Sequence, residues 1–141
     1  MGVDEIFKDE LEEEKREEEH NYNNPAVAAC EAELGPLILP ARAENPLLEQ
    51  REECLLEGGE KYTGEWLRGT QTRCGFGRQI FIDGTIYEGM WENGKAHGKG
   101  RVIHADGEYY EGDFREDKAH GFGVYSYLDG SRYEGSWIDD K

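Results

Sequence analysis

The stretch Tyr87–Arg132 decides the fold, because it states one pattern twice: YEGMWENGKAHGKGRVIHADGEY, then YEGDFREDKAHGFGVYSYLDGSR. A shorter third version, YEGSWIDDK, occupies Tyr133–Lys141, so that successive YEG triplets start 23 residues apart. Glycine, aromatic and Asp-Gly positions keep the same columns in each copy. Fixed columns at a single period indicate a repeat architecture.

An irregular copy precedes these. Lys61–Ile86 carries Tyr62, Gly64, Trp66 and a Gly-x-Gly pair at the expected places, but two extra residues enter between Trp66 and Gly75, around Arg68–Arg73. From Gly77 onward its spacing matches the later copies. Residues 60–141 are therefore interpreted as three copies and a partial fourth.

Each copy predicts a β-hairpin. Tyr87–Trp91 alternates large and small residues, as a strand with two different faces does. Asn93-Gly94 is the strongest short hairpin signal, because both central residues of a type I′ turn need positive φ. Asp117 and Asp140 replace this glycine in later copies, and Asp tolerates left-handed backbone well. We expect a mainly β fold: an elongated, single-layer antiparallel meander.

The aromatic columns are the main apolar resource of such a thin sheet. A glycine stands between the two aromatics of each copy, at Gly89, Gly112 and Gly135, where we expect the missing side chain to leave room for the rings. Two interpretations of the rings stay open, namely a groove that holds a partner segment or an intramolecular core. The candidate partner-binding residues are Tyr62, Trp66, Tyr87, Trp91, Tyr110, Phe114, Tyr133 and Trp137.

The motif Tyr-x-Gly-x-Trp/Phe-x-x-Gly-x-x-x-Gly-x-Gly at this period resembles the MORN (membrane occupation and recognition nexus) repeat family over about residues 61–141. The chain departs from the family pattern in the first-copy insertion, in Asp117 and Asp140, and in the short last copy. The resemblance implies stacked hairpins with an aromatic-lined groove. It also implies a scaffold or dimerisation module in cytoskeletal or flagellar structures, or an accessory region beside a lipid kinase or methyltransferase.

The N-terminal part differs in composition. Residues 1–60 hold 18 Asp/Glu against 5 Lys/Arg, whereas residues 61–141 hold 14 against 11. Residues 1–24 are predicted to be an acidic tail, either disordered or a helical arm that orders against a basic partner. Residues 25–59 are predicted to be a capping segment with two short helices: Ala26–Leu34 after Asn24-Pro25, and a second that starts at Asn45-Pro46 and ends at Gly58-Gly59. This second helix is expected to cover the first edge of the sheet.

Composition and spacing argue against several functions. A net charge of −16 disfavours nucleic acid and anionic membranes as general partners. No signal peptide or long apolar run is visible, and the three cysteines form no Cys-x-x-Cys pair, which is typical of a cytoplasmic chain. His97 and His120 share a column, but two strands separate them by about 9–10 Å, too far for one zinc ion. We expect no catalytic residues, metal or cofactor.

The sequence thus predicts a non-catalytic protein–protein interaction scaffold, cytoplasmic and associated with the cytoskeleton or a cilium or flagellum. The alternatives are the accessory module named above and a phosphoinositide or membrane-surface binder, for which Lys95, His97, Lys99 and Arg101 offer a local basic stripe. The strand Tyr133–Trp137 is expected to be an open edge. It could pair with a copy of the chain or a partner, or the chain could be a fragment of a longer array.

Overall fold

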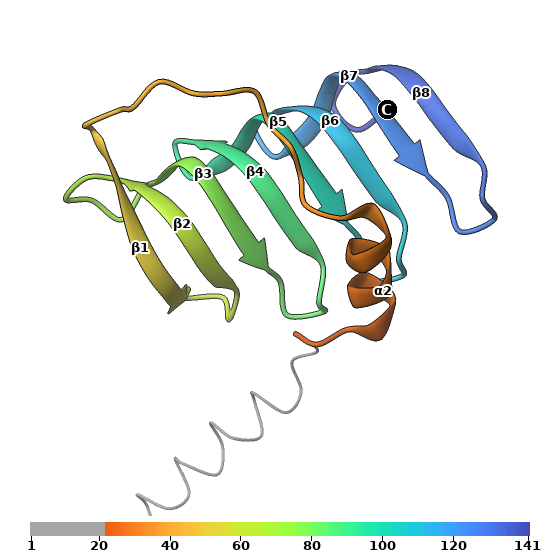
Figure 1. The fold of residues 1–141 in the computed structure, drawn as a ribbon, viewed down its shortest axis with the longest axis horizontal. Coiled ribbons are helices and arrows are strands. Elements are labelled where there is room, and N and C mark those ends of the chain that lie inside the picture. The colour runs from red at the N-terminus through yellow and green to blue at the C-terminus, as the bar shows by residue number, and fades with distance from the viewer. Residues whose placement is uncertain (1–21) are drawn as a thin grey trace, which may run out of the picture.

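The computed structural model describes residues 22–141, so almost all of the expected acidic tail lies outside the described residues. The described part is one eight-stranded antiparallel sheet in which every strand pairs with its neighbour in sequence (Figure 1). The strands are β1 (Leu48–Leu55), β2 (Lys61–Leu67), β3 (Arg73–Ile80), β4 (Ile86–Glu92), β5 (Lys95–Ile103), β6 (Tyr109–Arg115), β7 (Lys118–Ser126) and β8 (Arg132–Trp137). The predicted meander of repeat hairpins is confirmed.

The turns follow the expected chemistry. Asn93 and Gly94 have φ of 52° and 76°, and the replacement pair Glu116-Asp117 has 47° and 71°. Both pairs therefore take the left-handed backbone that a tight hairpin between twisted strands requires. Each of these two hairpins has a register shift close to its turn, between Gly89 and Trp91 in the β4–β5 pair and between Gly112 and Phe114 in the β6–β7 pair.

The predicted second helix is wrong. Leu48–Leu55 forms the strand β1, which pairs antiparallel with β2 from Leu48↔Leu67 to Leu55↔Lys61. The spacing of its leucines suits a helix as well as a strand, and a β-bulge between Arg51 and Cys54 hides the alternation of a strand. The N–H and C=O groups on the outer edge of β2 decide the outcome, because a helix lying beside β2 could not satisfy them whereas a strand does.

The first predicted helix is confirmed as α2 (Pro25–Leu34), with Pro25 in its first turn. The Asn24 side chain accepts hydrogen bonds from the backbone N–H groups of Ala26 and Val27, and the helix ends at Gly35. Asn24 also donates to the carbonyls of Asp83 and Ala105, which ties the helix start to two sheet turns.

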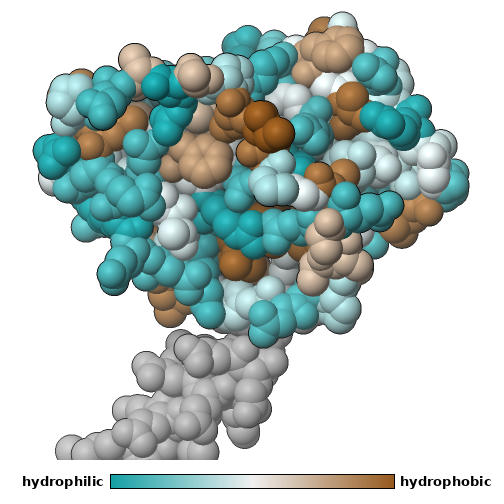
Figure 2. All heavy atoms as spheres, in the orientation of Figure 1, coloured by the Kyte–Doolittle hydropathy of each residue, from teal (hydrophilic) through white to brown (hydrophobic). Residues whose placement is uncertain are grey.

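This helix lies on one face of the sheet rather than at its edge (Figure 1). Val27 packs with Ile86 and Ile103 in a small core. The buried Arg101 side chain donates to the Gly35 carbonyl at 2.8 Å. Because successive strand residues face opposite sides, Tyr87 and Val102 belong to the other face. Figure 2 shows the helix-bearing side, where hydrophobic patches are separated by hydrophilic side chains.

Candidate functional site: an aromatic groove

The face opposite α2 carries a continuous ladder of aromatic rings. Tyr87 meets Trp91 of its own repeat at 5.1 Å between ring centroids and Phe114 of the next repeat at 5.0 Å, both edge to face. Tyr110 repeats the arrangement with Phe114 at 5.1 Å and Trp137 at 5.2 Å. Edge-to-face pairs contribute about 0.5–1.5 kcal/mol each beyond their buried area. The rings thus join each repeat to the next.

Glycines make room for this ladder, but not only at the positions expected. The Tyr87 ring lies over Gly100 of the neighbouring strand, where an added Cβ would stand 2.5 Å from the Tyr87 hydroxyl. Gly77 and Gly123 lie in the same way under Tyr62 and Tyr110. At Gly89 the nearest atoms to an added Cβ are backbone atoms of the neighbouring strand, namely Cα of its register partner Gly100 and the carbonyl oxygen of Lys99. Gly89 is therefore needed mainly for close approach of two strands, and its partner glycine makes room for the ring.

With the exception of Trp66 Nε1, the buried polar atoms of the ladder are satisfied within the protein. Each buried Tyr hydroxyl donates to the carbonyl three residues onward, as Tyr87 does to Met90 at 2.7 Å. The indole N–H of Trp91 donates to the Gly77 carbonyl at 3.1 Å. Trp66 Nε1 is buried without a hydrogen-bond partner among the described residues. The strand before it is the bulged β1, and the Arg51 guanidinium covers its ring at 4.9 Å.

Most of the predicted partner-binding residues are buried. Six of them have at most 8% of their surface exposed, whereas Tyr133 is 46% exposed. Trp137 is half-buried and packs against the ladder. The six buried residues are Tyr62, Trp66, Tyr87, Trp91, Tyr110 and Phe114. These rings hold the sheet together, whatever else they contact.

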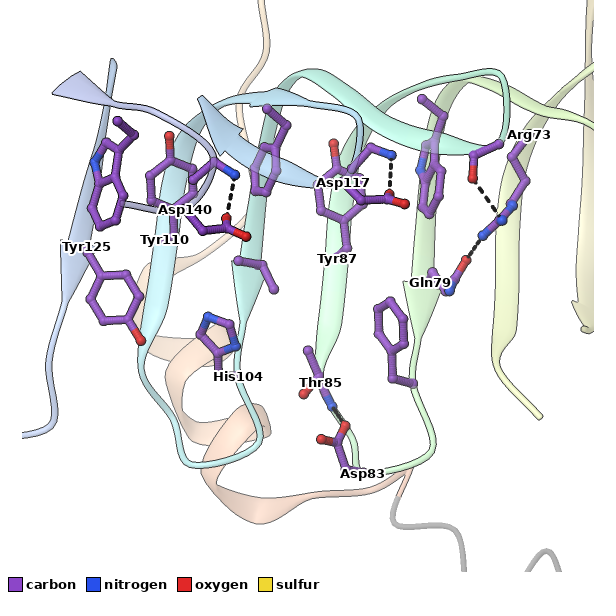
Figure 3. Close-up of a pocket in the computed structure, with 18 of the residues that line it drawn as sticks. Arg73, Gln79, Asp83, Thr85, Tyr87, His104, Tyr110, Asp117, Tyr125 and Asp140 are labelled. Carbon is purple, nitrogen blue, oxygen red and sulfur yellow. Dashed lines mark hydrogen bonds between the residues drawn. The ribbon is translucent and has the colours of Figure 1, made fainter. Parts of the chain in front are cut away.

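A groove of about 870 Å³ nevertheless runs over this face (Figure 3). It brings together five of the predicted residues, namely Tyr87, Trp91, Tyr110, Phe114 and Trp137. The other three, Tyr62, Trp66 and Tyr133, do not line it. The ring edges form the floor of the groove, at the centre of the repeat array.

The groove residues on the second strand of each hairpin were not predicted from the sequence. Val102 and Tyr125 pair with Tyr87 and Tyr110 across the register and line the groove beside them. Ala96 and Ala119, opposite Trp91 and Phe114, are also lining residues. The signal was present, because a residue directly opposite a groove-facing residue in an antiparallel pair shares its face.

Charged groups stand along one rim, where the tight turns lie. Arg73 donates to the Gln79 side chain and, at 2.9 Å, to the Gly94 carbonyl, and its guanidinium lies 4.6 Å from the Trp91 ring centroid. Asp117 Oδ1 accepts from the Ala96 N–H at 2.7 Å. Asp140 accepts in the same way from Ala119, also at 2.7 Å.

Burial and nearby carboxylates raise the pKa values of the tyrosine hydroxyls on the floor of the groove. Desolvation, reinforced by the charge of Asp117, raises the pKa of Tyr87 far above its usual value of 10. Desolvation, together with the charges of Asp113 and Asp140, raises the pKa of Tyr110 to about 12. The floor is therefore uncharged at neutral pH and acts as an apolar, hydrogen-bond-satisfied surface.

Residues 22–141 contain no group of three His, Cys, Asp or Glu side chains placed to hold a metal ion. His97 lies 3.4 Å from the carboxylate of Glu92 in its own hairpin, and His120 lies 3.4 Å from the carboxylate of Asp139, which follows β8. Within the same range, no helix is long and apolar enough to cross a membrane.

The fold and the ladder define a single-sheet repeat protein, in which each hairpin packs on the next. A family model of the MORN repeat matches residues 62–86, 87–109 and 110–132, about half of the chain. The chain belongs to the MORN-repeat family. These repeats are generally non-catalytic modules of protein interaction or membrane association. No curated protein is similar enough to the chain to count as a relative.

Proposed function

We propose that this protein is a non-catalytic interaction scaffold whose groove holds the apolar face of an extended or helical partner segment. The observation that supports it best is that the floor is apolar and complete in itself. Four polar groups of the floor already donate to backbone carbonyls of the protein: the hydroxyls of Tyr87 and Tyr110 and the indole N–H groups of Trp91 and Trp137. A ligand in the groove therefore contacts rings and aliphatic groups. Open apolar grooves of this kind mark interaction sites.

Two neighbours of the ladder allow a test that spares the fold. Val102 lines the groove and is only half-buried, and the equivalent residue of the next repeat is Tyr125. Val102→Tyr therefore fills the groove with a side chain that the repeat already tolerates. Phe122 is 54% exposed on the helix-bearing face, and its equivalent one repeat earlier is Lys99. Phe122→Lys is the matched control away from the groove.

The assay starts with peptides selected on the wild-type protein from an unbiased displayed library. We expect Val102→Tyr to weaken their binding at least tenfold in fluorescence polarisation, and Phe122→Lys to leave it within twofold. Circular dichroism should show the same sheet in all three proteins. Peptides that bind Val102→Tyr as tightly as wild type would place the binding site elsewhere. Substituting Trp91 or Phe114 instead would confound binding with folding, since both are buried.

A cytoskeletal or ciliary setting for the scaffold rests on the family resemblance alone. Crosslinking mass spectrometry in the native source tests it: crosslinks to axonemal or cytoskeletal proteins would support it, and crosslinks to a lipid kinase or methyltransferase would favour the accessory module instead.

The phosphoinositide alternative has less support from the geometry. In the basic stripe, Lys99 forms an ion pair with Asp113 at 2.5 Å, and Arg101 is 4% exposed and bonded to the Gly35 carbonyl. Both cationic side chains are therefore already bound to groups of the protein itself. Flotation with phosphoinositide liposomes at low salt should leave the protein unbound, and co-flotation would restore the alternative.

Self-association is a second candidate, because each outer strand of the sheet has one unpaired edge: β1 pairs only with β2, and β8 pairs only with β7. An open edge is a template for another strand. Light scattering after size exclusion should then show a concentration-dependent dimer that Gly135→Pro abolishes, and a monomer at all concentrations would remove the candidate.

A further inference from the structure

The turn rim of the groove is electrically polarised along the array. Arg73 lies at the β3 end, Asp117 further along, and Asp140 at the β8 end (Figure 3). Arg73 occupies the position that Ala96 and Ala119 fill in the next two repeats, directly opposite the Trp/Phe column. It is thus the one long cation of that column in the described residues, and it stands at the irregular turn that contains the two-residue insertion.

The Arg73 guanidinium is held but not neutralised. Its two terminal nitrogens donate to the Gln79 side chain and the Gly94 carbonyl, and its face rests on Trp91. Among the described residues no carboxylate lies within ion-pair distance of it. A guanidinium has five N–H donors in a rigid fork that suits a carboxylate. The site offers a preorganised cation with donors to spare.

The opposite end offers carboxylate oxygens. Asp117 and Asp140 each use Oδ1 to cap a backbone N–H, and no protein donor among residues 22–141 reaches the Oδ2 atoms. The other rim of the groove, at the opposite ends of the strands, carries Asp83, whose Oδ1 accepts from the Thr85 N–H. Asp106 and Asp129, the equivalents of Asp83 in the later repeats, do not line the groove.

The floor also selects the backbone of the occupant. A segment that runs along the groove crosses the strands, whose N–H and C=O groups already pair with one another. An extended occupant would cover rings with unpaired backbone groups, at a cost for each group excluded from water. A helix satisfies its own backbone. Its N-terminus carries partial positive charge and its C-terminus partial negative charge, which adds to the preference of the rim.

We propose that the occupant is an amphipathic helix that binds in one direction, with its N-terminus over Asp117 and Asp140 and its C-terminus over Arg73. This inference rests on the proposed function of the groove. The Asp117 and Asp140 carboxylates cap residues of β5 and β7, and Arg73 belongs to β3, so neighbouring anchors are two strands apart. At about 4.8 Å per strand, Arg73 and Asp140 act about 19 Å apart. A helix covers that distance with about 13 residues.

The occupant should therefore have an apolar stripe, a Lys or Arg in its first turn, and a Glu, Asp or terminal carboxylate about 13 residues onward. This order opposes the intrinsic preference of an isolated helix, which favours acids near its N-terminus and bases near its C-terminus. Helix stability alone would select the reverse arrangement. A selected preference for the proposed order thus reports the groove.

The test uses a library of displayed 18-residue peptides with a fixed Leu/Met/Phe stripe at helical spacing and Lys, Glu or Gln at random in the first and last turns. It is selected on wild type, with counter-selection on Val102→Tyr. We expect Lys-first, Glu-last peptides to exceed the reverse order about threefold to tenfold, the size that a few partly exposed ion pairs give. Arg73→Ala, which copies Ala96 and Ala119, should remove the preference for a terminal Glu. Asp117→Asn with Asp140→Asn, which keeps both turn caps, should remove the preference for an initial Lys.

Three other results would each overturn the inference. Groove-dependent peptides with random or reversed end charges would refute the direction while leaving the proposed function intact. If the Lys-first, Glu-last order is still preferred after Arg73, Asp117 and Asp140 have all been substituted, the rim does not recognise the charges of the peptide. A failure of every striped peptide to enrich over the Val102→Tyr counter-selection would refute the helical occupant, and the unbiased library would then decide whether the groove binds peptides at all.

Discussion

Gly100→Ala should destabilise the sheet strongly, although alanine is the smallest possible addition. The φ of Gly100 lies outside the left-handed region, so the backbone accepts alanine and the effect is steric. The new Cβ would stand 2.5 Å from the Tyr87 hydroxyl and 2.8 Å from two of its ring carbons. Ordinary contacts of a Cβ begin near 3.4 Å. The ring must therefore move by more than half an ångström.

Tyr87 has little freedom to move. It is 3% exposed, donates to the Met90 carbonyl and meets Trp91 and Phe114 edge to face. Overpacking of a dense core costs about 1–3 kcal/mol. Partial loss of two ring pairs adds about 1 kcal/mol. We expect the free energy of unfolding to fall by about 2–4 kcal/mol, measured by urea denaturation followed by tryptophan fluorescence.

Gly58→Ala is the matched control. Gly58 also has φ outside the left-handed region, but it is exposed and an added Cβ meets only the end of the Glu60 side chain. A change within about 0.5 kcal/mol is expected there. In a double-mutant cycle, Tyr87→Phe should relieve part of the Gly100→Ala cost, because the nearest atom to the new methyl group is the hydroxyl. A Gly100→Ala midpoint equal to that of Gly58→Ala would refute the ring-over-glycine account.

Three further perturbations test other parts of the structure. Glu31→Gln removes the negative charge that pairs with Arg78, and this should loosen the contact of α2 with the sheet. Amide exchange should then become faster over residues 25–34 and stay unchanged in the sheet, whereas unchanged exchange in the helix would mean that apolar packing alone holds it. Tyr110, whose pKa is raised to about 12 by burial, favours the neutral form in the fold, so its contribution to stability should be intact below pH 10 and fall as pH rises toward 12. Tyr110→Phe should therefore lose less stability than wild type over that range, and an equal loss in the two proteins would contradict the burial of Tyr110. Desolvation opposes ionisation of Asp113, but the Lys99 ammonium and the Phe122 N–H outweigh it and lower the pKa of Asp113; its contribution is present above pH 4 and lost as pH falls below, so Asp113→Asn should flatten the acid limb of a pH–stability curve.

The repeats were predictable because each column has one physical reason that recurs. Asn93-Gly94 marks a turn, and Tyr87 and Trp91 mark the ladder. The glycine under the ring was assigned to the wrong column, because Gly89 stands between the two aromatics in sequence whereas its register partner Gly100 lies under the Tyr87 ring. The strand β1 was not predictable in the same way. Its Glu-rich sequence suits a helix, and it becomes a strand because the edge of β2 needs a pairing partner, which is a property of another segment.

The candidate site was only partly predictable. The aromatic columns pointed to the correct face, yet their period could not say that Tyr62 and Trp66 lie beyond the groove or that Val102 lies in it. Arg73 escaped notice because the two-residue insertion shifts it out of the column of Ala96 and Ala119 in a simple alignment. Only the register of Trp66 with Arg73 restores its place. The insertion changes the sequence position of Arg73 relative to the repeat, whereas strand pairing keeps it opposite Trp66.

The hydrogen bonds of the indoles make the joints between repeats unequal. Trp91 and Trp137 each donate to a carbonyl 14 residues earlier, at Gly77 and Gly123, whereas Phe114, in the same column, has no donor. One buried hydrogen bond contributes about 0.5–1.5 kcal/mol. Among the three joints between successive repeats, at Trp91, Phe114 and Trp137, the one at Phe114 is therefore the weakest. A protein pulled from its two ends would part there first, leaving two short hairpin stacks rather than unravelling from one terminus.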